Sequence, residues 1–315
     1  MDECSGSVDD SEITVGESGS GSGVSTMVTL DVHPRDNLVG ELENLGSALE
    51  DMGLSITLFV PAALLAVPGV TRALVDLRAA NHEIGCHGLT HDAEDSYAHL
   101  PEDEQRRRLT EATRIIEDGI NAKVDLFRAP VFRLSAATLR VLDELGYRAD
   151  TSVPSTRLSI LSSDMWNLGY LRAPRRPYHP AADNAFRTGT LSIWEVPVSC
   201  YAIPFTVSFL QVFGARAMQR YLSALVAEGR RTGKPVVYMA HPEDFFPSDV
   251  LHPRMKLRPR HFLPSKTHGF AVRYAFGERD ERKIYDLNTG FVAGLTADSR
   301  LAPTTLGDYV DSMNV

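Results

Sequence analysis

The sequence alternates between short apolar segments, which are typical of β-strands, and longer segments with the spacing of amphipathic helices. Strands are expected at MVTLDV, SITLFV and HEIGCH, with helices between them at residues 37–52 and 70–80. In the first of these helices the leucines recur every three or four residues, which gives the helix one apolar face. Strands that are joined through helices run parallel in one sheet, so the alternation restricts the fold to the α/β class.

The same alternation continues towards the C-terminus. Helices are expected at residues 101–120, 135–145, 215–229 and 278–295, and strands at DLFRAP, YRADTSV, LSIWEVPVS, PVVYMAHP and near Thr304. The stretch from residue 154 to residue 187 is rich in proline, arginine and aromatic residues and is expected to be irregular. We expect a single catalytic domain over residues 26–315. Residues 1–25 are rich in Gly, Ser, Asp and Glu, so we expect a disordered acidic tail there.

Charge and cysteine content argue against several classes of protein. Lysine and arginine total 32 against 41 acids, and the net charge of −9 gives no support to a general role in binding nucleic acid. We find no apolar run of about 18 residues that would span a bilayer, and no basic segment followed by an apolar one that would mark a secretory signal. The three cysteines, Cys4, Cys86 and Cys200, are widely spaced. They are typical of reduced thiols, so we expect a cytoplasmic protein without disulfides.

Polar side chains stand at or just beyond the ends of the expected strands. Because the carboxyl ends of parallel strands meet at one edge or rim, these side chains are expected to share one site. They are Asp31, His33, His87, Arg128, Asp150 and His241. This coincidence is the main structural argument that the protein is an enzyme.

The first of these strand ends, TLDVHP, carries an acid and an imidazole two residues apart. Successive side chains of a strand point to opposite faces, so Asp31 and His33 share one face and Val32 takes the other. The alternative for His33 is a residue that packs against Pro34 without any chemical role.

The segment GCHGLTHD places His87 and His91 four residues apart after another strand. Two imidazoles at this spacing can bind one metal ion, and a catalytic site commonly has three protein ligands. His33 would supply the third, with Asp31 beside the metal as the base. The alternative is a pair of surface histidines in a polar loop.

Three further strand ends carry candidate residues. Arg128 in FRAP is expected to pair with a carboxylate, either Asp31 or Asp150. His241 in YMAHPEDF is placed to protonate a leaving group. Asp150 either orients an imidazole or caps a turn.

The order of these motifs resembles the polysaccharide deacetylase family, carbohydrate esterase family four. Its members have an aspartate motif at the first strand end, an H-S/T-x-x-H motif and an arginine–proline motif, followed by a later aspartate and a strand-end histidine. The matching segments are TLDVHP, HGLTH, RAP, YRAD and AHPED. The segment NHEIGCHGLTH is similar to the approach to the metal in this family, with Asn81 in place of a glycine.

The resemblance implies a distorted, incomplete (β/α) barrel and a hydrolase that uses a divalent metal, most commonly Zn²⁺. Such an enzyme removes an N-acetyl or N-formyl group from an amino sugar. His33, His87 and His91 would then bind the metal. Asp31 would be the base, and Arg128 would hold it in its charged form.

The same resemblance assigns the remaining candidates. His241 would protonate the departing amine, with Asp150 as the residue that orients it. The backbone N–H of Val131, which follows Pro130, would stabilise the oxyanion.

The first motif departs from the common family pattern. That pattern has two adjacent aspartates, base then ligand, whereas Val32 follows Asp31 here. One branch of the family spaces base and ligand as D-x-D or D-x-E, and DVH resembles this branch with His33 as the ligand. Three neutral imidazoles would leave more positive charge on the metal than a ligand set that includes a carboxylate. Alternatively, His33 is no ligand and the site is weak or inactive.

The expected substrate is an N-acylated amino sugar in a glycan, in a nucleotide sugar or on a lipid carrier. The runner-up function is hydrolysis of a non-sugar amide or cyclic imide on the same scaffold. A different class is a metal-free carbohydrate-binding pseudoenzyme.

The almost uncharged segment from Cys200 to Ala215 has two interpretations. The first is a buried strand and turn against the core. The second is an exposed apolar lip beside the metal, which would give the protein a peripheral contact with the inner face of the membrane. The residues of that lip would be Phe205, Phe209, Leu210 and Phe213.

Overall fold

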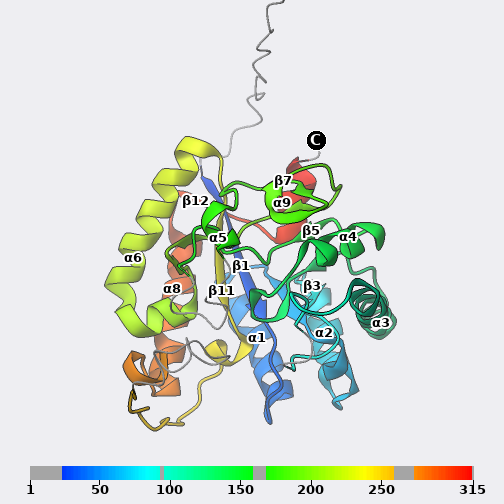
Figure 1. Ribbon diagram of the computed structural model, residues 1–315. Coiled ribbons are helices and arrows are strands. Elements are labelled where there is room, and N and C mark those ends of the chain that lie inside the picture. The colour runs from blue at the N-terminus through cyan, green and yellow to red at the C-terminus, as the bar shows by residue number, and fades with distance from the viewer. Residues whose placement is uncertain (1–22, 93–95, 159–167, 259–272, 314–315) are drawn as a thin grey trace, which may run out of the picture.

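The computed structural model describes residues 23–92, 96–158, 168–258 and 273–313. Its centre is a sheet of parallel strands that curls into an incomplete barrel, and helices surround it (Figure 1). The strand order is β11-β1-β2-β3-β4-β5-β8, so the strands follow one another in sequence until β11 returns beside β1. The expected distorted (β/α) barrel is confirmed. The strands are β1 (Val24–Asp31), β2 (Thr57–Val60), β3 (Glu83–Cys86), β4 (Leu126–Phe127), β5 (Ala149–Asp150), β8 (Trp194–Glu195) and β11 (Val236–Ala240).

The register aligns the carboxyl ends of neighbouring strands. Asp31 at the end of β1 pairs with Phe59 of β2, and Asp150 at the end of β5 pairs with Glu195 of β8. Leu30 pairs with Ala240 on the other side of β1. Polar residues that follow these strands therefore meet at one end of the barrel.

The gap between β8 and β11 is filled by irregular chain. The backbone N–H of Val237 donates to Ser199 Oγ at 2.9 Å, and the N–H of Met239 donates to the Phe205 carbonyl at 3.3 Å. Between these contacts lies a short hairpin of β9 (Cys200–Tyr201) and β10 (Ile203–Pro204). The barrel is thus closed by side-chain and isolated backbone contacts instead of a regular strand.

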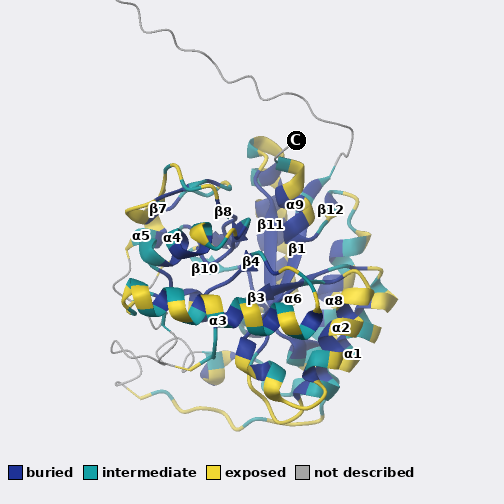
Figure 2. Ribbon diagram, turned by 90° about the vertical axis from the view of Figure 1, so that its right-hand side faces the viewer, coloured by how far each residue is buried: buried dark blue, intermediate teal, exposed yellow. Residues whose placement is uncertain are grey.

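The helices cover the outside of the barrel, with α1, α2 and α3 on one side and α6 and α8 on the other (Figure 1). Each turns an apolar face inward, which Figure 2 shows as buried residues alternating with exposed ones along the same helix. These helices are α1 (Leu38–Met52), α2 (Val70–Ala79), α3 (Glu102–Ile120), α4 (Ala136–Glu144), α5 (Gly169–Arg172), α6 (Val207–Thr232) and α8 (Glu281–Ala297).

A separate apolar cluster fills the inside of the barrel. It combines inward residues of the strands, such as Met27, Leu126 and Val237, with Leu306 and Val310 of the last helix, α9 (Leu306–Met313). This helix follows the short strand β12 (Leu301–Pro303), which pairs with the first residues of β1. Helix α9 therefore closes the amino-terminal end of the barrel, and the polar residues at the strand ends lie at the opposite end.

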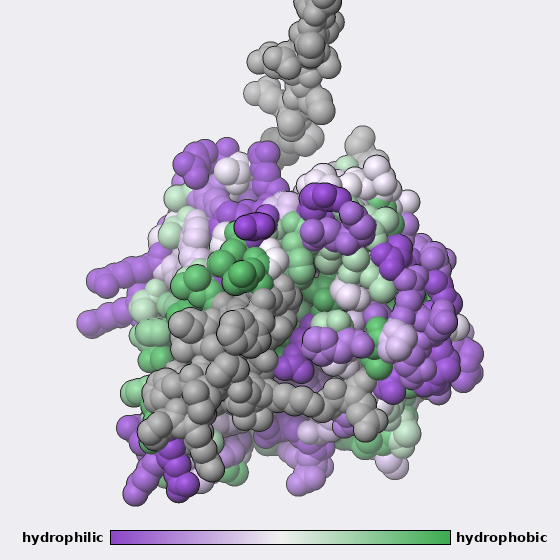
Figure 3. All heavy atoms as spheres, in the orientation of Figure 1, coloured by the Kyte–Doolittle hydropathy of each residue, from purple (hydrophilic) through white to green (hydrophobic). Residues whose placement is uncertain are grey.

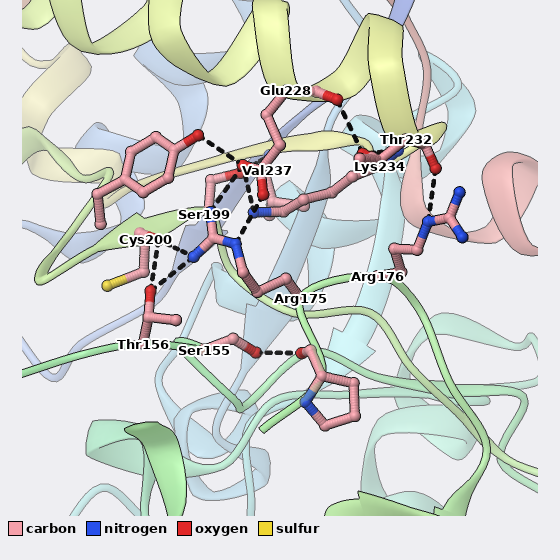
Figure 4. A network of polar contacts seen from close by, with 12 residues as sticks. Ser155, Thr156, Arg175, Arg176, Ser199, Cys200, Glu228, Thr232, Lys234 and Val237 are labelled. Atoms are coloured by element: carbon pink, nitrogen blue, oxygen red, sulfur yellow. Dashed lines mark hydrogen bonds and ion pairs between the residues drawn. The ribbon is translucent and has the colours of Figure 1, made fainter. Parts of the chain in front are cut away.

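A polar network fastens α6 to the same amino-terminal end (Figure 4). Glu228 of α6 accepts hydrogen bonds from Arg175 Nε at 2.6 Å and Nη2 at 2.7 Å, and from the Tyr201 hydroxyl at 2.8 Å. The buried Lys234, just before β11, lies 3.4 Å from the same carboxylate. Arg175 also donates to the Cys200 carbonyl at 2.7 Å. The network joins three segments that no regular sheet connects.

Several expected boundaries were wrong. Strand β1 starts at Val24, inside the tail expected at residues 1–25, while residues 1–22 lie outside the described part of the chain. The expected strand LSIWEVPVS is regular only at Trp194 and Glu195. Helix α6 begins at Val207 instead of residue 215, because Gly214, with φ of 76°, joins two helical pieces across a kink.

Other elements were not expected from the sequence. The irregular stretch contains a hairpin of β6 (Pro180–Ala181) and β7 (Asn184–Thr188) as well as α5, and residues 159–167 of that stretch lie outside the described residues. Short 3₁₀ helices are η1 (Ala62–Ala66), η2 (Pro130–Phe132) and η4 (Pro242–Phe245). Helix η2 follows β4, and η4 follows β11.

Candidate active site

A buried ion pair forms the floor of the site. Arg128 Nη1 donates to Asp31 Oδ1 and to Thr29 Oγ1, both at 2.9 Å, and Arg128 Nε donates to the Thr151 carbonyl at 2.9 Å. The Arg128 side chain is completely buried. Of the two partners expected for Arg128, the structure therefore selects Asp31. Burial alone would raise the pKa of Asp31, but the charges of Arg128 and then of His87 outweigh it and lower that pKa.

Packing beneath the guanidinium keeps it in place. The Phe59 ring lies with its centroid 4.6 Å from Arg128 Cζ, in the range of a cation–π contact. Gly85 on the neighbouring strand makes room for this ring, since a Cβ there would lie 2.7 Å from Phe59 Cδ1 and 2.9 Å from the Leu126 carbonyl oxygen. The close approach explains why a glycine stands in the middle of β3.

The three candidate ligands His33, His87 and His91 converge on one point. One ring nitrogen from each lies within 4.8 Å of the others. The His87 Nδ1 is 2.7 Å from the Arg128 carbonyl oxygen, whereas its Nε2 is buried and has no hydrogen-bond partner in the described chain. A buried nitrogen without a partner is costly unless a ligand satisfies it. The residues therefore fit a metal ion.

Two further features prepare the histidines for this role. Burial, more than any other factor, lowers the pKa of His87 to about 4, so its imidazole is neutral and its lone pair is free at pH 7. Gly88, with φ of 84°, turns the chain directly after His87 and brings His91 back towards it. Their ring centroids are 5.4 Å apart.

Asn81 stands at the turn that leads into β3. It adopts φ of 65°. Asparagine tolerates this left-handed conformation better than most residues, so the turn into β3 is kept.

The ring of His33 neighbours the rings of two other histidines. Its ring centroid is 4.4 Å from that of His91 and 4.5 Å from that of His241. Its Nδ1 is 3.9 Å from Oε1 of Glu243, a largely buried carboxylate that the sequence analysis missed. The other oxygen of Glu243 is buried without a hydrogen-bond partner among the described residues. A carboxylate behind a histidine commonly fixes the orientation of its ring.

His241 is oriented by Asp244, and not by Asp150 as the resemblance suggested. Asp244 Oδ2 lies 3.1 Å from His241 Nδ1 and accepts the backbone N–H of His241 at 2.9 Å. Burial would lower the pKa of His241, but the charge of Glu243 and the hydrogen bond with Asp244 outweigh it and raise that pKa. The HPED sequence, in which an acid follows the histidine by three residues at the start of η4, was the signal that could have identified Asp244.

Asp150 supports the turn after β4 instead. Its Oδ1 accepts a hydrogen bond from Ser152 Oγ at 2.5 Å, and Ser152 Oγ accepts the backbone N–H of Ala129 at 2.7 Å. Across the sheet Asp150 faces Glu195, another carboxyl that the sequence analysis missed. Burial first, and then the charge of Asp150, raises the pKa of Glu195 well above its usual value. The buried pair of carboxyls therefore lies behind the arginine–proline turn and not beside His241.

The residues expected to bind the oxyanion lie in that turn. Pro130 is buried at the first position of η2, and Val131 adopts φ of 56°, a left-handed conformation that is rare for a β-branched residue. The Val131 N–H has no acceptor among the described residues, and the residue is 37% exposed. Such local strain is found at functional sites, and a free N–H is available to a ligand.

A pocket of about 630 Å³ opens beside His33. Its walls come from the segment after β1, from η4, from residues 252–255 and from residues 273–284, with Gln211 of α6 at one side. The volume is within the range of small-molecule sites. The sequence analysis did not identify this pocket, because its walls come from segments that are far apart in the chain.

The expected apolar lip at Cys200–Ala215 was wrong for two of its residues. Phe205 and Leu210 are buried in the core, Phe209 is partly buried, and Phe213 is 51% exposed. Figure 3 shows apolar atoms gathered near the middle of one face, with hydrophilic atoms around its edge. No described helix is long and apolar enough to cross a membrane. Membrane contact stays a prediction.

Comparison with known proteins gives a match to one protein family and similarity to solved structures. Residues 20–149 match the polysaccharide deacetylase family. A solved structure from Mycobacterium smegmatis, described as a polysaccharide deacetylase, aligns with a TM-score of 0.57 at 16% identity and covers 92% of this chain and 91% of its own. The 4-alpha-glucanotransferase from Thermococcus litoralis aligns with a TM-score of 0.55 at 13% identity, over 92% of this chain and 40% of its own. No curated protein matches the sequence. At these identities the two structures show the fold alone.

Proposed function

Taking as premise the polysaccharide deacetylase family, which residues 20–149 match, we propose that the protein is a metal-dependent carbohydrate N-deacylase. It removes an N-acetyl or N-formyl group from an amino sugar and releases the free amine and acetate or formate. The observation that carries the proposal is the convergence of three histidine nitrogens within 4.8 Å, beside a buried carboxylate that is held charged by an arginine.

His33, His87 and His91 would hold the divalent cation, which we propose is Zn²⁺, because imidazole nitrogens suit this ion. When bound, the cation supplies positive charge that polarises the acyl oxygen and acidifies a neighbouring water. The unpartnered Nε2 of His87 supports this assignment.

Asp31 would act as the general base. Its Oδ1 is engaged by Arg128, and its Oδ2 lies 4.0 Å from His87 Nε2, so one oxygen faces the ligand cluster. The ion pair with Arg128 keeps this carboxylate deprotonated. Asp31 can therefore accept a proton from the water that attacks the acyl carbon.

His241 would act as the general acid. Its ring centroid lies 4.5 Å from that of His33, and Asp244 holds its Nδ1 at 3.1 Å. The carboxylates around it raise its pKa, so it carries the proton that the departing amine needs when the C–N bond breaks. Val131 N–H would bind the oxyanion that forms between these two steps.

Release of acetate and formate from N-acetylated and N-formylated amino sugars tests the proposal. Free, nucleotide-linked and lipid-linked sugars are compared, with Zn²⁺ added to the metal-stripped protein. Metal-dependent release from at least one member supports the proposal. If the protein binds zinc but hydrolyses only a cyclic imide, the reaction class stays hydrolytic and the sugar assignment is wrong. If it neither binds metal nor releases acid, it is a pseudoenzyme.

We also propose that the protein works in the cytoplasm and contacts the inner face of the membrane where the substrate is lipid-linked. The support for the location is the cysteine content, and the support for the membrane contact is the exposed Phe213 at the start of α6. Sedimentation with liposomes, for the wild type and for Phe213→Ser, tests the contact. If both sediment equally or neither does, Phe213 makes no such contact.

A further inference from the structure

We propose that the pocket lined by His33 recognises an anionic group of the substrate, and that Arg273 is the residue that binds it. The inference rests on the proposed function, because it assigns a substrate class to the same site. The substrate would be an N-acylated amino sugar that carries a phosphate or a carboxylate.

The pocket connects Arg273 with the reacting end of the site. Both Arg273 and His33 line it, as do Gln211 and Asp244. Asp244 Oδ2 lies 3.1 Å from His241 Nδ1, and the His241 ring centroid lies 4.5 Å from that of His33. A substrate whose acyl group lies at the histidines would therefore reach Arg273 with a neighbouring part of the same molecule.

Arg273 is held in place while most of its donors stay available. Its Nε donates to Gln211 Oε1 at 2.9 Å, and Gln211 Nε2 in turn lies 3.5 Å from Asp244 Oδ1. Within residues 23–92, 96–158, 168–258 and 273–313, neither Nη atom of Arg273 has a hydrogen bond or an ion pair. A guanidinium fixed at Nε presents its two Nη atoms as a planar fork, which suits a phosphate or a carboxylate.

Other charged side chains of the pocket already have partners. Arg35 donates from Nε to Glu41 at 2.9 Å, and Glu281 accepts a hydrogen bond from His252 Nε2 at 2.8 Å. Arg279 donates from Nη1 to the His252 carbonyl at 3.1 Å. Arg35 also lies 3.8 Å from Glu243 and 3.6 Å from Glu281, so its charge is offset, whereas neither Nη atom of Arg273 has a carboxylate partner among the described residues.

An anionic substrate needs such a residue, because the whole chain carries a net charge of −9, which disfavours the approach of anions. The exposed Arg254 lines the same pocket and adds positive charge at its outer part. The pocket of about 630 Å³ has room for a sugar with its anionic substituent.

The experiment compares three probes that share one acyl group. They are N-acetylglucosamine, N-acetylglucosamine 1-phosphate and N-acetylmuramic acid, which are neutral, phosphorylated and carboxylated. We expect the wild type to prefer one of the anionic sugars, and Arg273→Ala to raise KM for it about 10- to 100-fold with little change in kcat. Arg273→Lys should recover part of the loss, because it restores the charge without the fork.

Arg282→Ala on α8 is the matched control, because it removes the same charge from a side chain that is 54% exposed and outside the pocket. It should leave all three KM values unchanged. Equal kcat/KM for neutral and anionic sugars in the wild type, or an equal loss on both in Arg273→Ala, would overturn the inference while the proposed deacylase function stands.

A polyprenyl diphosphate-linked N-acetylglucosamine in detergent is a fourth probe. A lower KM for it than for the sugar phosphate identifies the lipid-linked form as the source of the phosphate.

Binding separates failure of the inference from failure of the proposed function. Calorimetric titration of N-acetylglucosamine 1-phosphate into Asp31→Asn needs no turnover. One outcome would support the anion site and contradict the deacylase proposal. In it the wild type hydrolyses no probe, the sugar phosphate binds to Asp31→Asn, and this binding is lost when Arg273→Ala is added to that variant. If the sugar phosphate and the neutral sugar bind with equal affinity, the inference is wrong.

Discussion

Asp31 Oδ1 and Arg128 Nη1 lie 2.9 Å apart in a buried ion pair, while the second carboxylate oxygen lies 4.0 Å from His87 Nε2. One carboxylate is thus in contact with its counter-ion and close to the ligand cluster. The arrangement keeps Asp31 charged and close to the three converging histidines, which are the candidate ligands.

Asp31→Asn is therefore expected to keep its metal and lose turnover. The amide has a similar shape but cannot accept the proton, so kcat should fall about 10²- to 10⁴-fold. Metal content by mass spectrometry and release of acetate are measured on the same sample. Asp51→Asn, at an exposed position at the end of α1, is the control. An Asp31→Asn protein that is purified without metal would make Asp31 a ligand.

Much of this site could be predicted from the sequence, because its residues stand at strand ends. Asp31, His87, Arg128 and His241 each end or follow a parallel strand, and the topology of the barrel brings such positions together. The spacing of His87 and His91 was sufficient to pair them. Local pattern and a simple topological rule were enough in each case.

Residues whose roles depend on tertiary contacts were missed or misassigned. Asp150 was assigned to His241, yet its hydrogen bond to Ser152 connects it to the turn after β4. Glu243 and Arg273 line the same pocket as His33 although they are far apart in the chain, which no local pattern reveals. The length of the strand at LSIWEVPVS was overestimated for a similar reason. Its residues favour β-structure, but most of them lie in the irregular segment that closes the barrel.

Glu243→Gln is expected to weaken metal binding without abolishing it. Its Oε1 lies 3.9 Å from His33 Nδ1, and loss of a carboxylate behind a ligand commonly costs about 10- to 100-fold in metal affinity. Competition with a zinc chelator measures the Kd. Glu50→Gln, exposed on α1, should leave it unchanged. An unchanged Kd in Glu243→Gln would show that His33 needs no carboxylate behind it.

Asp244→Asn is expected to lower kcat more than it raises KM. The amide cannot reproduce the charged hydrogen bond to His241 Nδ1 at 3.1 Å, so the imidazole loses both its orientation and its preference for the protonated form. We expect a loss of about 100-fold in kcat, as for impaired general-acid catalysis. The metal content should stay that of the wild type. A variant with full kcat would remove Asp244 from the mechanism.

The network at the other end of the barrel predicts an acid-dependent loss of stability. Burial would raise the pKa of Glu228, but hydrogen bonds from Arg175 and Tyr201 and the charge of Lys234 outweigh it and lower that pKa to about 2. Because the pKa is lower in the folded protein than in the unfolded one, the stabilisation is complete above about pH 4.5. It is lost as the pH falls from there towards 2.

Glu228→Gln should accordingly unfold more easily at neutral pH, by about 1–3 kcal/mol, and the difference from the wild type should shrink as the pH falls below 4.5. Urea denaturation at pH 7, 5, 4 and 3 measures the two free energies of unfolding. A difference that is the same at pH 7 and pH 3 would show that the charge of Glu228 contributes nothing.

Zinc titration of the metal-stripped protein tests the central claim, that His33, His87 and His91 together hold one catalytic metal. Wild type is compared with His33→Ala, His33→Asp, His87→Ala and His91→Ala, each checked for native circular dichroism. The account predicts one tight zinc per chain in the wild type, severe loss of affinity in all three alanine variants, and retained binding with altered affinity in His33→Asp. Full zinc occupancy together with full activity in His33→Ala would contradict it.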